Sequence, residues 1–521
     1  MLYVVVKLTV VQPPVWGNLR TPWEIAYIKS FVESNGHHKV NTVDSSISAL
    51  PLITKFALEI RRKVSDSFVI ETYLTSLGFL TSIAECYLIR IFYKEHVYDY
   101  RNATRALLST KIHLDDESLE KLTDIFCTSN FFIKFDSLLK EQCNEILLKE
   151  PDYVGCTTHI TSFPIALFLL KYVKELSPNT VTILSGYQAS MNARDVCDRC
   201  SWVDFVIRGE SEYGYLEILE NKTKVRGVYN VKNVILNMDD MPPPDYSDLN
   251  MKDYKMISIM ASRNCPHGIC TFCQEDAFWS EFRFKNPKLL VDEMEVQYER
   301  HGINRFDFVD LDIRDFVLPF CENLKQKKHD FKWSGAMRAD KKTPPLLKKM
   351  GNANCKSMFF GFESGSARIL KLMQKNITLD SLSETVKEAY NNGIRSKLTC
   401  ITGLPTETWD DFQRTLNFIE RNSKYIPIVL VQSFKALTRS PIGVALQKPE
   451  NEYGLKLRNK PELALIQDLL YSYNYEGTPE PNEVLDRHVK ARRFFRDLGV
   501  GERAVLVSSN PKHKKNLLGI R

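Results

Sequence analysis

The second half of the chain alternates short apolar stretches with longer amphipathic ones, and this alternation restricts the fold more than any other feature of the sequence. Strands separated by helices favour a parallel sheet, because each helix returns the chain to the same edge. The pattern therefore predicts an incomplete (β/α)6 barrel with active residues at the carboxyl ends of its strands. The six expected strands are 256–262, 305–310, 332–338, 357–362, 397–402 and 426–432.

The first half also alternates strands and helices, and it predicts a doubly wound, Rossmann-like sheet. The expected strands lie near the N-terminus and at 39–43, 152–156, 180–186 and 205–208. Ligands of such sheets bind beyond the carboxyl ends of the strands. We therefore expect the loops 12–17, 155–161 and 186–191 to line a binding site.

Two further segments complete the predicted domain organisation. Residues from about 50 to 150 form long amphipathic stretches, which predict a helical insertion that acts as a lid or serves packing alone. Met241-Pro-Pro-Pro-Asp-Tyr246 interrupts regular structure, because proline lacks the backbone donor of a helix or sheet. We expect an N-terminal domain over 1–240, a partial barrel over 250–435 and a C-terminal region over 436–521.

Three cysteines follow the first expected barrel strand closely. Cys265, Cys270 and Cys273 can hold one iron–sulfur cluster and leave one iron open, whereas electron-transfer clusters usually take four cysteines. A zinc site would want a fourth Cys or His at a regular spacing. His267 lies between the first two cysteines, where it could hardly complete the same tetrahedron. On spacing alone, zinc and three unrelated thiols remain alternatives to a catalytic cluster.

Composition places the chain among ordinary globular proteins. Of its 521 residues, 44% are hydrophobic and 26% charged. The twelve cysteines are scattered along the chain, which favours reduced thiols and ligands over a disulfide framework. We therefore expect a cytoplasmic location. We expect no signal peptide and no membrane span, because the N-terminus lacks a basic region and the apolar stretch 74–92 contains Glu85 and Arg90.

Positive charge is concentrated at the end of the sequence. The formal net charge is +6, and residues 487–521 carry ten Lys or Arg against two acidic residues. Such a run is usually a solvated face, and docking of an acidic peptide or another anionic partner is the sharper alternative. We expect no nucleic-acid binding, since no aromatic-interleaved motif accompanies these charges.

Several separated motifs together resemble one family. The cysteine loop, Gly361-Phe-Glu-Ser-Gly365 and Gly403-Leu-Pro-Thr-Glu407 resemble the radical S-adenosylmethionine (SAM) superfamily. Segments 151–155, 185–186 and 208–212 resemble the cobalamin-binding domain of its B12-dependent class, which includes the class B methyltransferases. The similarity covers about 1–45 and 150–455.

Two departures from the family pattern concern ligands. Four residues separate Cys265 from Cys270 where the family usually has three, and Gly268 can absorb the extra residue through a conformation closed to other residues. The chain also lacks the Asp-x-His-x-x-Gly signature of a lower axial histidine, so we expect cobalamin without one. His159 is an untested candidate for that role.

The resemblance implies a [4Fe–4S] cluster on Cys265, Cys270 and Cys273, with SAM on the open iron. The implied SAM contacts are Phe272, Asp310, Arg338, Glu363 and Gly403. Alternatives are a hydrophobic plug for Phe272, a structural salt bridge for Arg338 and turn chemistry for the glycines. The implied cobalamin contacts are Gly155, Thr157, Thr158, Ser185, Gly186 and Gln188. Cys197 and Cys200 are better explained as two separate thiols than as a metal pair.

The implied activity is methylation of an unactivated carbon in a natural-product or peptide substrate. In the family, a 5′-deoxyadenosyl radical from SAM removes hydrogen, methylcobalamin supplies the methyl group, and an electron donor of the flavodoxin or ferredoxin type reduces the cluster. Alternatives are a non-methylating rearrangement or cyclisation, and a sensor that binds the cofactors without turnover. A methylthiotransferase is disfavoured, because the remaining cysteines lack the ligand spacing of a second cluster.

Overall fold

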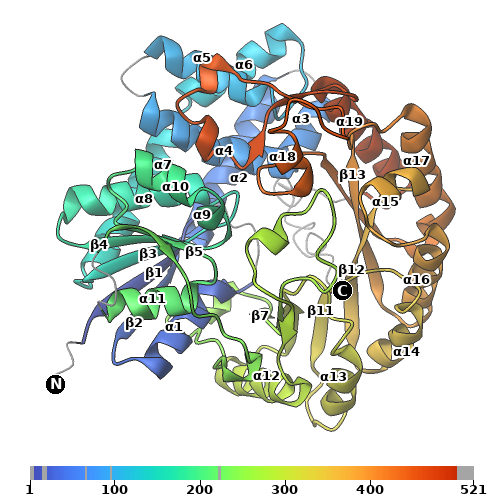
Figure 1. Cartoon of the computed structure of the whole chain (residues 1–521), viewed down its shortest axis with the longest axis horizontal. Helices are drawn as coiled ribbons and strands as arrows, with labels where there is room; N and C mark the ends of the chain where they lie inside the picture. The colour runs from blue at the N-terminus through green and yellow to red at the C-terminus, as the bar shows by residue number, and fades with distance from the viewer. Residues whose placement is uncertain (1–4, 15–19, 65–66, 94–96, 221–224, 502–521) are drawn as a thin grey trace.

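The N-terminal half of the computed structural model is a six-stranded parallel sheet (Figure 1). The structure describes residues 5–14, 20–64, 67–93, 97–220 and 225–501. The sheet order is β2-β1-β3-β4-β5-β6, so the chain reverses its direction of winding between β1 and β3, as expected for a doubly wound fold. Its strands are β1 (Lys7–Gln12), β2 (Lys39–Asp44), β3 (Tyr153–Thr157), β4 (Val181–Ser185), β5 (Phe205–Arg208) and β6 (Gly227–Asn230).

Helices cover both faces of this sheet. On one face α1 (Trp23–Asn35) and α11 (Ser211–Leu219) pack against each other and share a core with the strands. On the other face α8 (Phe163–Leu176) packs against β3 and β4. The short helices α9 (Tyr187–Met191) and α10 (Ala193–Arg199) follow β4.

The insertion between β2 and β3 is helical, as the sequence predicted. An aromatic cluster holds it together, in which the Phe56 and Phe131 rings stack with centroids 4.2 Å apart. Among the described residues no single helix is long and apolar enough to cross a bilayer, although α3 and α4 together pass that test as a pair bent by 66°. Its helices are α2 (Ser46–Lys63), α3 (Ser67–Leu74), α4 (Leu77–Phe92), α5 (Val97–Leu108), α6 (Asp116–Thr128) and α7 (Asn130–Leu147).

The second half forms the expected partial barrel of six parallel strands, in the order β14-β13-β12-β11-β10-β7. The first expected strand is shorter than predicted, because the chain turns after Ile259 into a hairpin of β8 (Ser262–Arg263) and β9 (Arg283–Phe284) that brackets the cysteine loop. The barrel strands are β7 (Ile257–Ile259), β10 (Arg305–Phe308), β11 (Lys332–Met337), β12 (Cys355–Glu363), β13 (Arg395–Thr402) and β14 (Ile428–Ser433).

The helices of the barrel lie outside its strands (Figure 1). In α12 the Asn286 side chain accepts a hydrogen bond from the Lys288 amide, Pro287 begins the first turn, and Gly302 ends the helix with φ +68°. The other helices are α13 (Val317–Leu324), α14 (Pro344–Asn352), α15 (Ala367–Leu372), α16 (Leu379–Asn391) and α17 (Trp409–Asn422). The apolar faces of α13, α14, α16 and α17 share one core with the strands, whereas Ile369 and Leu370 of α15 pack in a separate cluster with residues after β14.

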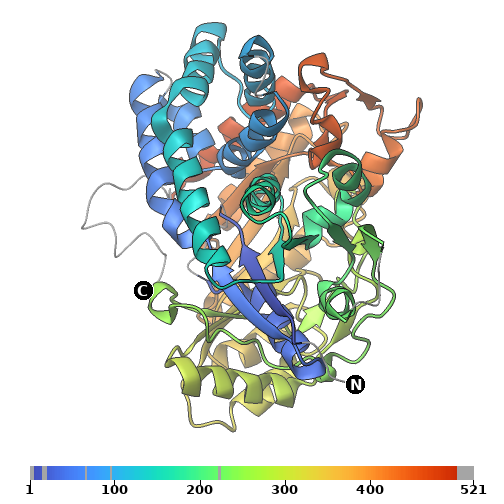
Figure 2. The same cartoon turned by 90° about the vertical axis from the view of Figure 1, so that its left-hand side faces the viewer.

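The segment after β14 lies beside the helical insertion, far from it in sequence (Figures 1 and 2). It contains α18 (Pro441–Ala445), the antiparallel pairs β15 (Ala436–Leu437) with β17 (Ser472–Tyr473) and β16 (Lys456–Leu457) with β18 (Tyr475–Glu476), and α19 (Pro481–Asp497). Arg487 is buried and its Nη1 lies 2.9 Å from Glu407 Oε2, so part of the predicted basic tail is structural. Residues 502–521 of that tail lie outside the described residues.

Candidate active site between the two sheets

The cysteine loop starts from the β8–β9 hairpin and is fastened to α15. The Thr271 amide donates to the Met373 carbonyl at 3.1 Å, and His267 Nε2 lies 2.7 Å from the Gln374 carbonyl oxygen. Gly268 has φ +60°, a conformation that other residues rarely adopt, and this confirms how the longer loop is accommodated. Cys265, Cys270 and Cys273 are half-buried free thiols.

Glu363 ends β12 beside this loop. It is buried, has φ +62°, and accepts hydrogen bonds from Lys375 Nζ at 2.9 Å and Thr399 Oγ1 at 3.0 Å. Burial alone would lower the pKa of Lys375, but the neighbouring carboxylate outweighs burial and raises it. Lys375 Nζ also lies 5.6 Å from the centre of the Phe272 ring. The Glu363–Lys375 ion pair therefore lies next to the cysteine loop.

Asp310 holds the start of the cysteine loop. Its buried carboxylate accepts hydrogen bonds from the Ala261 amide at 3.1 Å and from Ser262 Oγ at 2.6 Å. Burial raises the pKa of Asp310 to about 6, against the effect of these hydrogen bonds. Its position supports a role in orienting the loop.

A buried arginine–glutamate network joins the cysteine loop to the N-terminal half. The network consists of Glu210, Glu212, Arg263 and Arg283, and all four side chains are buried. Arg263 Nη2 lies 2.5 Å from Glu212 Oε1, its Nη1 contacts Glu210, and Arg283 binds Glu210 from the other side. Burial alone would raise the pKa of Glu210, but the two guanidinium groups lower it. Two residues after Arg263 comes Cys265, so the network positions the first cysteine.

Two adjoining cavities open between these elements. The first, the apolar chamber, has a volume of about 390 Å³ and includes Phe272, Cys273, Glu363 and Cys400 in its wall, with Leu77 from the insertion. The second, the interdomain chamber, has a volume of about 520 Å³ and is lined by residues of both halves, among them Glu24, His159, Trp279 and Asp310. The two chambers share Leu77, Ile160, Tyr187 and Glu275.

Comparison with known proteins identifies the second half. A sequence model of the radical SAM superfamily matches residues 259–419. Residues 259–419 form a radical SAM domain. This domain implies a [4Fe–4S] cluster and SAM. The match contains all three cysteines of the loop together with Glu363 and Gly403.

Relatives and solved structures extend the similarity beyond the radical SAM domain. An uncharacterized methyltransferase of Pyrococcus horikoshii is 25% identical over 52% of this chain and 64% of its own length. The anaerobic magnesium-protoporphyrin IX monomethyl ester cyclase of Rubrivivax gelatinosus is 26% identical over 54% and 56%. The chain thus spans less than two thirds of these curated relatives.

One solved structure matches nearly the whole chain. The cobalamin-dependent SAM radical enzyme OxsB, solved with aqua-cobalamin and SAM bound, superposes with a TM-score of 0.64 over 99% of this chain and 70% of its own, at 15% identity. At this identity the match shows the fold. Both halves and their order therefore match the fold of this solved structure, as the motifs predicted.

The cysteines of the radical SAM domain suit a cluster better than a single ion. Within the described residues, no three His, Cys, Asp or Glu side chains converge on a point that could hold one metal ion. A [4Fe–4S] cluster does not require such convergence, because each thiolate binds a different iron. Cys273 lies in the wall of the apolar chamber, so a cluster held by these cysteines would border that chamber.

The other predicted SAM contacts occupy different places. Phe272 and Glu363 line the apolar chamber, and Asp310 lines the interdomain chamber. Arg338 donates to the carbonyl of Lys375, and the Gly403 amide donates to Glu407 Oε2 at 2.8 Å. Neither Arg338 nor Gly403 belongs to the described walls of the two chambers. Their roles as SAM contacts stay predictions.

The predicted cobalamin contacts lie at or near the carboxyl ends of β3 and β4, and most of them already contact neighbouring residues of the protein. Thr158 Oγ1 donates to the Ser185 carbonyl at 2.8 Å, and Gly186, with φ +91°, leaves no room for a Cβ beside Thr158. The close approach expected at Gly155 is made by Tyr215, whose hydroxyl would lie 2.4 Å from an added Cβ. Thr157 Oγ1 donates to Glu24 Oε2 at 2.8 Å.

Gln188 is the predicted contact that retains a free acceptor. Its Nε2 donates to Asn192 Oδ1 at 2.6 Å, whereas its buried Oε1 has no hydrogen-bond partner in the described part of the chain. Buried polar atoms are normally paired. An amide-bearing ligand at this end of the sheet would supply the missing donor, which fits the corrin side chains of cobalamin.

Two of the three loops that the sequence predicted as walls of a binding site do line the chambers. Ile160 comes from the loop 155–161 and Tyr187 from the loop 186–191. Residues 15–17 of the third predicted loop lie outside the described residues. Sequence reasoning missed Glu24 in α1 and Leu77 in the insertion, because neither segment carries a signal of a cavity wall. His159, named only as an untested ligand, has its Nε2 3.1 Å from Glu24 Oε2.

Proposed function

We propose that this protein is a cobalamin-dependent radical SAM methyltransferase acting on an unactivated carbon of a natural-product or peptide substrate. The observation that carries the proposal is the shared wall of the two chambers, formed by Leu77, Ile160, Tyr187 and Glu275. One chamber borders the cysteine loop and the other borders the carboxyl end of the N-terminal sheet. A substrate in the apolar chamber can thus face both cofactor sites.

The residues of the chain hold and orient the reactants. Cys265, Cys270 and Cys273 hold the cluster, and the arginine–glutamate network fixes their loop. Glu363 offers carboxylate oxygens to the ribose hydroxyls or ammonium of SAM, and its ion pair with Lys375 prevents it from rotating freely. When bound, the cofactors supply the radical and the methyl group. The apolar wall excludes water, which would otherwise quench reactive species.

A second function is favoured by one relative. The relative from Rubrivivax gelatinosus is named a cyclase, and this name describes the closure of a ring. The same two chambers would suit a rearrangement or cyclisation, in which the substrate gains no methyl group. The mass of the product separates the two functions.

The direct test uses anaerobically purified full-length protein with SAM, cobalamin and a low-potential reductant of the flavodoxin or ferredoxin type. We expect 5′-deoxyadenosine, about four irons per chain, and, with the true substrate, S-adenosylhomocysteine and one added methyl group. Formation of 5′-deoxyadenosine without S-adenosylhomocysteine, and without an added methyl group on the substrate, would support the rearrangement. Absence of deoxyadenosine from the iron-replete protein would reject both.

The matched variants use cysteines of two kinds. Replacing Cys265, Cys270 and Cys273 together with Ala should remove the iron and the brown colour. Replacing Cys197 and Cys200 with Ala should leave both unchanged, because these thiols lie in α10 and at its end, away from the cluster loop. Full iron content in the triple variant would show that the cluster site is assigned wrongly.

The cobalamin site has its own spectroscopic test. We expect the electron paramagnetic resonance spectrum of the bound cob(II)alamin form to lack nitrogen splitting from a protein imidazole. The expectation rests on the missing Asp-x-His-x-x-Gly signature; the contact of His159 Nε2 with Glu24 engages one ring nitrogen and by itself does not exclude a ligand role. Nitrogen splitting that disappears in a His159→Ala variant would identify His159 as the lower ligand instead.

A further inference from the structure

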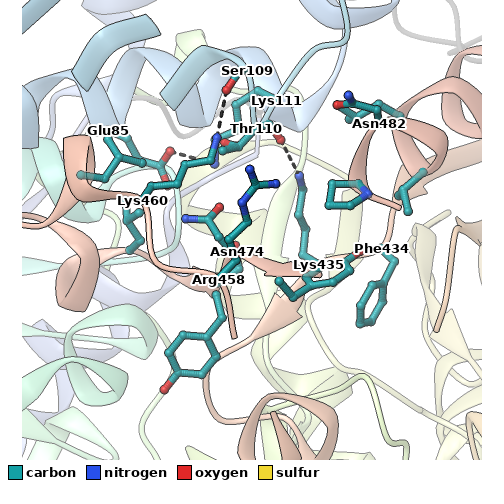
Figure 3. Close-up of a pocket in the computed structure, with 18 residues that line it drawn as sticks. Glu85, Ser109, Thr110, Lys111, Phe434, Lys435, Arg458, Lys460, Asn474 and Asn482 are labelled. Atoms are coloured by element: carbon teal, nitrogen blue, oxygen red, sulfur yellow. Dashed lines mark hydrogen bonds and ion pairs between the residues drawn. The ribbon is translucent and has the colours of Figure 1, made fainter. Parts of the chain in front are cut away.

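A third cavity adjoins the apolar chamber and collects positive charge. This cavity, the cation pocket, has a volume of about 260 Å³ and lies between the helical insertion and the segment after β14 (Figure 3). Four cations line it, Lys111, Lys435, Arg458 and Lys460, and the described lining contains one carboxylate, Glu85. The charged groups of the lining therefore have a formal excess of three positive charges.

Two of the four cations are held by neutral acceptors. Lys435 Nζ donates to the Thr110 carbonyl at 3.2 Å, and Lys460 Nζ donates to Ser109 Oγ at 3.0 Å and to the Ala106 carbonyl at 3.2 Å (Figure 3). Lys111 Nζ lies 2.8 Å from Glu85 Oε2. The acceptors fix the positions of the ammonium groups without neutralising them, except at Lys111.

The pKa values of two lysines in the pocket are lowered by burial and by the neighbouring positive charges. Burial and the charge of Lys111 lower the pKa of Lys435 to about 7. Burial and the charge of Arg458 likewise lower the pKa of Lys460. Arg458 is exposed, and its Nε lies 3.8 Å from Glu476 Oε1 outside the lining. Like charges kept together at such a cost are typical of a site that binds an anion.

The cation pocket adjoins the chamber beside the cysteine loop. Lys111, Phe434, Lys435 and Leu485 line both cavities. Lys435 therefore lies at the boundary between a mainly apolar space and a cationic one. A single ligand can place an apolar body in the first and an anionic group in the second.

We infer that the cation pocket binds the phosphate group of a substrate whose apolar body occupies the chamber beside the cysteine loop. An excess of three positive charges matches a phosphate dianion better than a single carboxylate, and Asn474 and Asn482 add amide donors to the lining (Figure 3). The inference rests on the proposed function in one respect: it takes the apolar chamber to be the place of reaction.

The test measures phosphate binding to the full-length protein with its cluster assembled. Inorganic phosphate, pyrophosphate and acetate are titrated at constant ionic strength, with calorimetry and the thermal unfolding midpoint as readouts. We expect phosphate and pyrophosphate to bind and to raise the midpoint, and acetate to do neither at the same concentration. Absence of phosphate binding, or equal binding of acetate, would overturn the phosphate assignment.

Variants locate the binding. Lys435→Met combined with Lys460→Met should weaken phosphate binding on the order of tenfold or more, because two charged donors are removed. Arg458→Gln, an exposed position whose change does not disturb the core, should weaken it in the same direction. Lys448→Met removes one positive charge from an exposed residue of the same segment and should leave affinity unchanged. Equal loss in Lys448→Met would show general charge attraction and reject the site.

The two proposals fail in different ways. If the wild type releases deoxyadenosine but binds no phosphate, the substrate inference is wrong and the proposed function stands. If phosphate binds through Lys435 and Lys460 but no deoxyadenosine forms, the proposed function is wrong and the anion site stands. Far-ultraviolet circular dichroism and iron content of each variant show that a loss of binding is not a loss of folding.

Discussion

The arginine–glutamate network and the cation pocket are both groups of charges that join distant parts of the chain, yet their charge balance is opposite. The network pairs two guanidinium groups with two carboxylates, all of them buried. The pocket brings four cations to one described carboxylate. A balanced set needs nothing further, whereas an unbalanced set gains from a ligand of opposite charge. Charge balance thus separates a structural joint from a candidate binding site.

Removing one charge should therefore have opposite effects in the two places, and the largest effect is expected in the network. Arg263→Met would leave Glu212 buried without its guanidinium partner, whereas Glu210 would keep Arg283. We expect the free energy of unfolding to fall by about 3–5 kcal/mol, because the cost is that of an uncompensated buried charge. Urea denaturation measures this, and iron content should fall too, since Cys265 is close by.

An exposed arginine provides the control for that prediction. Arg414→Met removes a partner of Asp410 on the surface of α17 and should leave the free energy of unfolding nearly unchanged, because exposed ion pairs contribute little. If Arg263→Met and Arg414→Met unfold at the same denaturant concentration, the network does not hold the domains together as described.

In the cation pocket, removal of a charge should stabilise the ligand-free protein. We expect Lys435→Met to raise the free energy of unfolding by roughly 1–2 kcal/mol at pH 7, because burial of an ammonium group near other cations is unfavourable. Lys111→Met is the opposing control, since it leaves Glu85 without its cation and should destabilise. A Lys435→Met variant less stable than the wild type would mean that the pocket is balanced after all.

The pH dependence of that difference provides a smaller effect. Lys435 in the folded protein has a pKa of about 7, lowered from its ordinary value of 10.5 by burial and by Lys111. The unfolded chain thus binds more protons between these two values, so wild-type stability rises with pH in that window. The advantage of Lys435→Met should therefore shrink steadily from pH 7 to 9.5.

Lys448→Met again serves as the reference, and its difference from the wild type should stay constant with pH. Phosphate affinity should change in the opposite sense and fall as pH rises above 7, because the neutral amine no longer attracts the anion. A constant Lys435→Met advantage over this range would contradict the lowered pKa of Lys435.

Salt should produce the smallest change. Added sodium chloride should reduce the advantage of Lys435→Met by about 0.3 kcal/mol, because ions reach the cation pocket more easily than the buried network. The cost of Arg263→Met should change less. Denaturation curves at low and high salt for the two variants would reveal the difference, and equal salt responses would mean equal access to solvent.

The sequence predicted the sheets well, because each strand is a run of apolar residues with a polar residue at its carboxyl end. It missed β6, whose four residues are half-exposed and form the edge of the sheet. Edge strands are buried on fewer sides, so their hydrophobic signal is weak. The first barrel strand was predicted too long, because the apolar run continues into the β8–β9 hairpin.

The cysteine loop was predictable from local spacing, whereas the chambers were not. At Gly155 the sequence indicates a close approach but cannot say whether a ligand or Tyr215 makes it. Lys111 is separated by hundreds of residues from Lys435 and Lys460, and only the fold brings the three to one cavity. The predicted basic run drew attention elsewhere, and its Arg487 proved to be paired inside the protein.

Placement of Arg263 two residues before Cys265 also limits how this domain can be recombined in evolution. Its carboxylate partners Glu210 and Glu212 belong to the other half of the chain. A gene fusion that transferred the barrel alone would carry two arginines into a foreign protein without their counter-charges. Recombination should therefore preserve both halves together, and a genetic exchange at the three prolines should yield a destabilised protein.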